Sequence, residues 1–218
     1  MVIYEPESVK GFPEYLPPES QKYEAIKDII KKQFQLHGFL PIKTSTIEFD
    51  ELMRSDTLEE DEAVSDRFRL HDKGGRNLGL RYEFTFQLAR IFKQHPNFKL
   101  PFRRYQIGSV FRDEPTGSDR YREFMQCDAD IIGEPSIKAD VECILLWNDI
   151  FKELKINAKF NLNHKQLAHA ILDSIKIEKK TEVLRELDKI EKLGEDAVKG
   201  NIRKYADTNQ VITLFKLL

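Results

Sequence analysis

Apolar residues recur at helical spacing in several stretches of the chain, and the clearest of these predicts a helix over residues 19–37. Gly38 follows as a natural C-terminal stop. The apolar stripe of this helix consists of Tyr23, Ile26, Ile30, Phe34 and His37. Two further helices are predicted over residues 85–94, ended by Pro96, and over residues 136–154.

Alternating apolar and polar residues predict strands between these helices. Residues 39–49 predict one strand, and residues 67–85 predict a hairpin whose turn is DKGG, at positions 72–75. Residues 102–132 predict two more strands, joined by a polar loop over Asp113–Asp119. The chain therefore mixes helices with an antiparallel sheet.

The composition changes beyond Asn161, where Pro and Gly become rare and Lys, Glu and Leu at helical spacing dominate. We place a domain boundary near Phe160, between a main domain (1–160) and a small helical module (161–218). The acidic stretch over residues 56–62 is predicted to be a solvated loop.

Composition and charge exclude several classes of protein. The 218 residues are 40% hydrophobic and carry 35 basic and 37 acidic side chains, as in ordinary globular proteins. No apolar run approaches the roughly 18 residues of a membrane helix, and MVIYEPESVK lacks the features of a signal peptide, so we expect a cytoplasmic protein without membrane contact. Two cysteines, Cys127 and Cys143, and five scattered histidines predict neither a disulfide nor a metal site.

Three neighbouring predicted strands each carry one polar face, because successive side chains of a strand point to opposite faces. These polar residues are Arg81, Glu83 and Thr85, then Arg104, Gln106, Gly108 and Arg112, and finally Gln126, Asp128 and Asp130. An antiparallel sheet with one face in water explains any one of these strands. Short or fork-shaped groups on all three are better suited to fixing a small ligand, and Gly108 permits close approach.

Several separated segments resemble histidyl-tRNA synthetases, which are class II aminoacyl-tRNA synthetases. Motif 2 of the eukaryotic and archaeal type is similar to FRRYQIGSVFRDEPTGSDRYREFMQCDADIIG, and the first histidine-binding segment is similar to LGLRYEFTFQLAR. Motif 1 is similar to GFPEYLPPES with the following helix and strand, and the helical insertion is similar to LNHKQL with LDKIEKLGEDAV. The resemblance implies an α+β fold in which an antiparallel sheet with flanking helices precedes a helical module.

The resemblance also implies roles for individual residues in the histidine site. Glu83 and Thr85 would hold the α-amino group, while Gln126 and Asp130 would bind the histidine, with Asp130 as the partner of the imidazole. Arg112 would be catalytic, since it would grip the histidine carboxylate and the α-phosphate of ATP together.

The ATP site implied by the resemblance comprises Arg112, Glu114, Arg120, Arg122 and Phe124. Glu114 would meet the adenine, Phe124 would stack on its ring, and Arg120 or Arg122 would reach the distal phosphates. Without the resemblance, the alternative for the last two arginines is that they are solvated loop charges. ATP would enter with Mg²⁺ as a substrate complex, no prosthetic group is implied, and the partners would be histidine, tRNA(His) and a second copy in a homodimer.

Two departures from the family pattern shape the expected function. Ser45 stands where motif 1 has a proline, and nothing in the chain resembles motif 3 or an anticodon-binding domain. The principal hypothesis is the N-terminal catalytic part of a histidine–tRNA ligase that is weakly active or inactive alone. The alternatives are a non-catalytic paralogue, such as the regulatory histidine-binding subunit of ATP phosphoribosyltransferase, and a module that only dimerises or contacts tRNA.

Overall fold

The computed structural model describes residues 7–53 and 66–217, so the predicted acidic loop over residues 56–62 lies outside the described residues. The chain divides into two compact units, Met1–Ala158 and Lys159–Leu218. The division falls close to Phe160. Each unit has a hydrophobic core of its own and is described by itself below.

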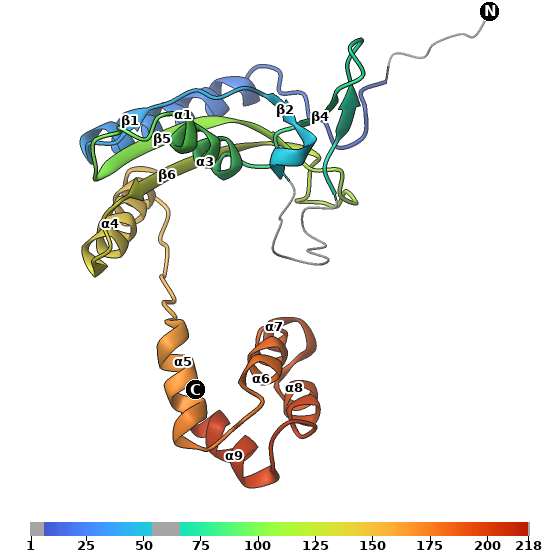
Figure 1. Ribbon diagram of the computed structural model, residues 1–218, viewed down its shortest axis with the longest axis vertical. Coiled ribbons are helices and arrows are strands. Elements are labelled where there is room, and N and C mark those ends of the chain that lie inside the picture. The colour runs from blue at the N-terminus through green and yellow to red at the C-terminus, as the bar shows by residue number, and fades with distance from the viewer. Residues whose placement is uncertain (1–6, 54–65, 218) are drawn as a thin grey trace, which may run out of the picture. The chain divides into compact units, whose positions relative to one another are not determined.

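The first unit is built on a long β-hairpin of strands β5 (Phe102–Phe111) and β6 (Glu123–Ile132). The two strands are antiparallel over their whole length, with Arg104 opposite Asp130 and Gly108 opposite Gln126. The short strand β1 (Leu40–Pro41) adds to the other edge of β5 in parallel (Figure 1). The prediction of two strands joined by a polar loop is confirmed here.

A second, smaller antiparallel sheet has the strand order β2-β4-β3. Its strands are β2 (Ile47–Phe49), β3 (Arg69–His71) and β4 (Asn77–Leu80). The predicted turn between the last two is confirmed, because the Asp72 carboxylate accepts hydrogen bonds from the backbone N–H groups of Gly74 and Arg76. A single turn of 3₁₀-helix, η1 (Asp50–Met53), follows β2.

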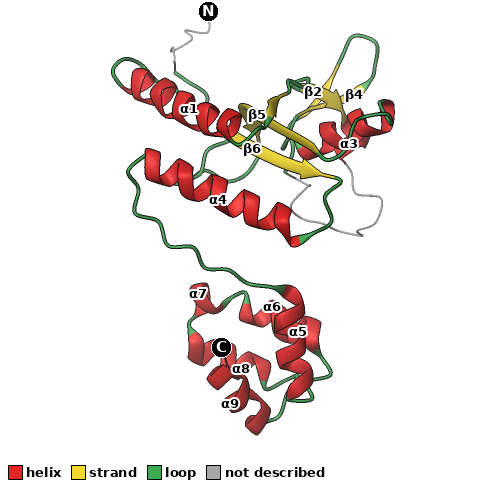
Figure 2. Cartoon of the chain, turned by 90° about the vertical axis from the view of Figure 1, so that its left-hand side faces the viewer, coloured by secondary structure: helices red, strands yellow, loops and turns green. Residues whose placement is uncertain are grey.

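Helices α1 (Glu19–Leu36) and α4 (Ile137–Glu153) pack against β5 and β6 (Figure 2). Their shared core consists of Phe34, Phe39, Tyr105, Leu146 and Ile150, with the inward side chains of the hairpin packed around it. Helix α3 (Thr85–Gln94) follows β4, and Ser136 caps the start of α4. The three helices predicted in this unit are confirmed, although Ile26 of the predicted stripe is 46% exposed.

The prediction of one strand over residues 39–49 is wrong. The segment forms β1, leaves the first sheet, and enters the second sheet as β2. Between them, the Thr44 hydroxyl exchanges hydrogen bonds with the Gln106 side chain at 2.9 and 3.4 Å. The backbone carbonyl of Thr46 accepts from Arg81. These bonds give polar groups of the segment that connects β1 to β2 their partners, although no continuous strand ladder is present there.

The prediction that strand alternation continues to Thr85 is also wrong. Strand β4 ends at Leu80, and residues 81–84 form no regular element before α3 begins. Tyr82 and Phe84, expected on the apolar side, are buried with Arg81. Tertiary contacts of these side chains with β5 and with the loop that follows it override the period of two.

The second unit consists of helices packed around an apolar core. They are α5 (Lys165–Ser174), α6 (Lys180–Leu187), α7 (Ile190–Leu193), α8 (Glu195–Ile202) and α9 (Thr208–Leu217). The core residues are Leu172, Ile177, Val183, Val198, Ile202, Val211 and Leu214. Helical periodicity beyond residue 161 predicted this unit.

In the part of the chain that the structure describes, no helix is long and apolar enough to cross a membrane. Cys127 and Cys143 are free and half-buried. Burial raises the pKa of the Cys127 thiol to about 11, so this residue behaves as a small core side chain and not as a nucleophile.

Candidate functional site

The segment before α3 lies across the polar face of the β5–β6 hairpin. A Cβ atom on Gly108 would sit 2.9 Å from the Arg81 Nη2 atom and 3.5 Å from the Phe84 Cζ atom, so a larger residue here would require the Arg81 side chain to shift. The Arg81 guanidinium donates from Nε to the Ser109 carbonyl at 2.6 Å. The crossing therefore fixes Glu83 above the hairpin face.

The polar face of the hairpin is not simply turned to water. Arg104 is fully buried and Gln106 is only 3% exposed, whereas the acidic residues of β6 are half-buried. The explanation that one sheet face is merely solvated is thus wrong for these positions. A buried polar face requires partners, and the hairpin register supplies Arg104 with Asp130.

Three carboxylates, those of Glu83, Asp128 and Asp130, interact electrostatically in this site. Asp128 accepts a hydrogen bond from the Gln126 Nε2 atom at 2.9 Å, which fixes the amide of Gln126. With Nε2 turned to Asp128, the Gln126 oxygen remains an acceptor for another group.

Burial raises the pKa of Glu83, and the negative charges of Asp128 and Asp130 raise it further, while a hydrogen bond from Thr85 and the charge of Arg112 lower it. Burial likewise raises the pKa of Asp130, against the opposing charge of Arg104. A cation placed among these carboxylates would relieve both effects. The site is therefore suited to an ammonium group or an imidazole.

Arg112 lies at the edge of the acidic cluster between two aromatic rings. Its guanidinium carbon is 4.4 Å from the centroid of the Tyr82 ring and 5.1 Å from that of the Phe124 ring. The Nε atom is buried and has no hydrogen-bond partner within residues 7–53 and 66–217. A guanidinium that packs against two aromatic rings and has an unused donor is suited to binding an anionic ligand.

Glu114 organises the loop that joins β5 to β6. Its carboxylate accepts hydrogen bonds from the Tyr82 hydroxyl at 3.3 Å and from the Arg120 Nε atom at 2.5 Å. Its backbone carbonyl accepts from the Arg122 Nε atom at 3.2 Å. Arg122 also faces Asp113 at 3.6 Å. Both arginines are thus tied to Glu114, and neither is a free loop charge.

The predicted site residues lie in the loop that joins β5 to β6 and along one face of the hairpin, as far as Asp130 near the opposite end of β6. Thr85 is the first residue of α3 and is exposed, but it reaches Glu83. Sequence reasoning missed Tyr82, which it placed on the apolar side although its ring covers Arg112. It assigned no role to Arg104, although counting the hairpin register back from the loop would have set this residue opposite Asp130.

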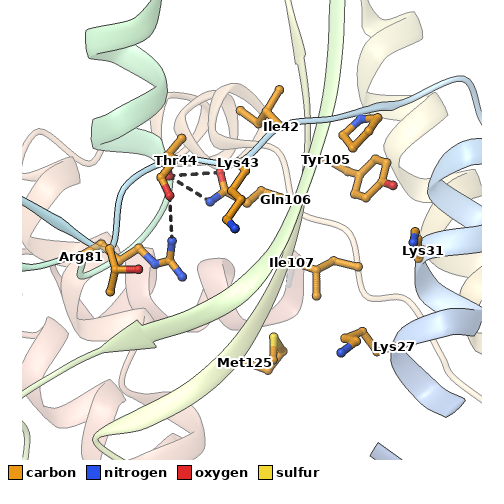
Figure 3. Close-up of a pocket in the computed structure, with 12 residues that line it drawn as sticks. Lys27, Lys31, Ile42, Lys43, Thr44, Arg81, Tyr105, Gln106, Ile107 and Met125 are labelled. Carbon is orange, nitrogen blue, oxygen red and sulfur yellow. Dashed lines mark hydrogen bonds between the residues drawn. The ribbon is translucent and has the colours of Figure 1, made fainter. Parts of the chain in front are cut away.

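A separate cavity of about 370 Å³ lies between α1, β5 and the segment that connects β1 to β2 (Figure 3). Lys27, Lys31 and Lys43 reach its rim, and Tyr105, Ile107 and Met125 supply apolar walls. None of the predicted site residues lines this cavity. Among residues 7–53 and 66–217, no group of three or more histidine, cysteine or carboxylate side chains is arranged to hold a metal ion.

The site described above combines a cluster of carboxylates with a guanidinium whose Nε atom has no hydrogen-bond partner among the described residues. A ligand that carries a positive and a negative group, such as an amino acid, fits both parts at once. An anion bound at Arg112 would also lie beside the loop that holds Arg120 and Arg122.

Comparison with known proteins identifies relatives of this chain. The family model for histidyl-tRNA synthetase matches residues 11–214. Histidine–tRNA ligase 1 of Bacillus cereus is 38% identical over 223 residues, covering 98% of this chain and 51% of the relative. The crystal structure of histidyl-tRNA synthetase from Nostoc sp. PCC 7120 superposes with a TM-score of 0.83 at 25% identity, covering 98% of this chain and 48% of that one.

A second crystal structure, of an ATP phosphoribosyltransferase regulatory subunit/histidyl-tRNA synthetase from Bacillus halodurans, superposes with a TM-score of 0.78. At 22% identity this likeness shows the shared fold alone. The chain spans about half the length of the curated relatives that it matches.

Proposed function

Because this chain belongs to the histidyl-tRNA synthetase family, we propose that its first unit forms the part of a histidine–tRNA ligase that binds histidine and ATP. The observation that carries the proposal is the position of Arg112, whose guanidinium lies against two aromatic rings and interacts electrostatically with Glu83 of the acidic cluster. An amino acid meets both kinds of group in this arrangement. The predicted α+β fold is the fold of this family.

In the proposed site the acidic cluster holds the positively charged end of histidine. Glu83 and Thr85 bind the α-amino group, and the free Gln126 oxygen accepts a further hydrogen bond from the ligand. Asp130 accepts from an imidazole N–H. These contacts turn the histidine carboxylate toward Arg112.

Arg112 is the catalytic residue in this proposal. Its guanidinium binds the histidine carboxylate and the α-phosphate of ATP together, which aligns the carboxylate oxygen with the phosphorus. The oxygen attacks the phosphorus, histidyl-adenylate forms, and pyrophosphate leaves with its negative charge neutralised by the Mg²⁺ that enters with ATP. A ribose hydroxyl at the 3′ end of tRNA(His) then attacks the carbonyl carbon of the histidyl-adenylate, and AMP leaves.

The loop between β5 and β6 serves the nucleotide in the same proposal. Glu114 meets the adenine side, Phe124 stacks on the ring, and Arg120 or Arg122 binds the distal phosphates. Both arginines touch Glu114 in this structure, so binding of phosphate replaces the contact that Arg120 makes with the Glu114 carboxylate. Homodimer formation, a cytoplasmic location and the role of the helical unit as an insertion that follows motif 2 belong to the proposal by family membership.

Calorimetric titration of histidine tests the proposal, with and without ATP and Mg²⁺. Wild-type chain is expected to bind histidine, and ATP is expected to strengthen this binding. The Arg112→Ala variant should lose at least about tenfold in affinity, since a charge-assisted contact in a partly buried site contributes about 1.5–3 kcal/mol. Arg76→Ala is a matched control, because Arg76 is exposed and its side chain pairs with Asp72 in the β3–β4 turn.

Equal histidine binding by wild type and Arg112→Ala would contradict the assignment of Arg112. Histidine binding that ATP leaves unchanged would support the histidine-binding regulatory alternative over the ligase. Absence of binding of either ligand would overturn the proposal that this chain forms the site.

A further inference from the structure

We infer that Arg104 is a positioning residue of the histidine site, where its buried guanidinium fixes the Asp130 carboxylate, ionised, in the place where it meets an imidazole. The inference rests on the proposed function only in naming the imidazole as the ligand group. The pairing of Arg104 with Asp130 can be tested without any ligand.

The hairpin register places the two residues opposite one another, Arg104 on β5 and Asp130 on β6. The Nη2 atom of Arg104 and the Oδ2 atom of Asp130 form an ion pair. The arginine side chain is 0% exposed, whereas the aspartate side chain is 34% exposed although its Oδ2 atom is buried. One side of the carboxylate thus faces the arginine inside the unit, and the rest is open to a ligand.

The contact that holds the arginine is its ion pair with Asp130. Its Nε, Nη1 and Nη2 atoms are all buried, and none makes a hydrogen bond of good geometry with a described residue. Burial lowers the pKa of Arg104, while the negative charges of Asp130, Asp128 and Glu83 raise it. A buried guanidinium with unused donors is costly, and an apolar side chain would avoid that cost. The compensating benefit is the positive charge beneath three carboxylates.

Asp130 depends on that charge. Burial and the neighbouring Asp128 raise its pKa, and Arg104 is the group that lowers it. Glu83 before α3 and Cys143 on α4 also interact electrostatically with Asp130. Without Arg104 the carboxyl would take up a proton more readily, become a hydrogen-bond donor, and attract an imidazole cation less strongly.

Carbon-13 NMR of the Asp130 carboxyl, assigned by comparison with Asp130→Asn, measures the effect directly in the unliganded chain. Arg104→Met removes the charge at similar size, and its Asp130 titration midpoint should rise by about one pH unit or more. Arg104→Lys keeps the charge and should stay near the wild-type midpoint. Arg103→Met is the matched control, because the neighbouring Arg103 pairs with Glu142 instead.

An unchanged Asp130 midpoint in Arg104→Met would overturn the inference. If that variant does not fold, Arg104→Gln, which retains donors without the charge, carries the same expectation. Histidine titration then adds a second readout: as the pH is lowered, Arg104→Met should lose histidine affinity at a higher pH than wild type does, because its Asp130 takes up a proton at a higher pH. A wild-type chain that binds no histidine would count against the proposed function, while the carboxyl titration would still decide the role of Arg104.

Discussion

At the scale of single residues, the candidate site holds charged groups in surroundings that disfavour their charges. Burial and the neighbouring Asp128 and Asp130 raise the pKa of Glu83. An active site that is prepared for a ligand in this way lowers the stability of the unliganded chain. The same groups therefore affect binding and stability in opposite directions.

Glu83→Gln is expected to stabilise the unliganded chain while weakening histidine binding. Since the folded-state pKa of Glu83 is raised, the folded chain binds more protons than the unfolded chain just above the ordinary glutamate pKa, and stability falls as the pH rises through that window. Removal of the charge should add about 0.5–1 kcal/mol at pH 7 and nothing near pH 4.

Urea unfolding at pH 7 and pH 4 measures this effect of Glu83. Glu153→Gln, which changes an exposed glutamate at the end of α4, is the control and should behave like wild type at both pH values. A Glu83→Gln variant that is less stable than wild type at pH 7 would show that the carboxylate contributes more by its contacts than it costs by burial.

Gly108→Ala should destabilise the first unit by about 1–3 kcal/mol. The new Cβ would meet the Arg81 Nη2 atom at 2.9 Å, and Arg81 cannot easily move because it is buried and bonded to the Ser109 carbonyl. Thermal or urea unfolding measures the loss. Gly117→Ala is the control, because its nearest contact would be an ordinary 3.8 Å to the Arg120 Cβ atom. Equal stability of Gly108→Ala and wild type would mean that residues 81–84, which cross the hairpin, are free to shift.

At the scale of elements, the two faces of the β5–β6 hairpin have different roles in the first unit. One face packs on α1 and α4, and the other carries the acidic cluster with Arg104 and Arg112. The start of β5 is joined to α4 by two hydrogen bonds from Arg103 to the Glu142 carboxylate, at 2.8 and 3.0 Å. This pair joins elements that are far apart in the sequence.

Arg103→Met should destabilise the first unit by up to about 1 kcal/mol at pH 7, as expected for a partly exposed ion pair of good geometry. The hydrogen bonds from Arg103 are the main reason that the pKa of Glu142 is lowered. The contribution is therefore complete above the ordinary glutamate pKa and is lost as the pH falls through the lower folded-state value.

A double-mutant cycle with Glu142→Gln, followed by urea unfolding between pH 7 and pH 3, tests the Arg103–Glu142 pair. The coupling between the two substitutions should shrink as the pH falls. Coupling of constant size across this range would argue against an ionic contribution.

At the scale of the whole molecule, the chain consists of two units with separate cores. Leu172 is 1% exposed within the core of the second unit. Leu172→Ala should therefore destabilise Lys159–Leu218 by about 2–5 kcal/mol through loss of buried contacts and formation of a cavity. Hydrogen exchange should show faster exchange in α5 and α9 and unchanged protection in β5 and β6.

Leu167→Ala is the matched control for the second core, because Leu167 lies on the same helix but is 60% exposed and should change stability little. Equal loss of protection in both units after Leu172→Ala would show that they unfold as one. That outcome would contradict the division of the chain into independent cores.

The sequence by itself determined the elements with strong local periodicity and the family. Helices α1, α3 and α4 and the long hairpin follow from local spacing, since one face of each must be buried. The two faces of β5 and β6 followed from alternation alone, because both strands are regular over ten residues. The segment resemblance gave the family, because motifs such as REFMQCDADIIG are specific in their residue order.

Only the tertiary structure decided how the segments around the site are used. Residues 39–49 divide between two sheets, and residues 81–84 cross the hairpin instead of extending β4, because side-chain bonds and buried rings there outweigh local preference. The stacking of Tyr82 on Arg112 and the burial of Arg104 beneath Asp130 depend on contacts between residues far apart in the chain. Spacing along a sequence carries no information about such contacts until the register of the strands is known.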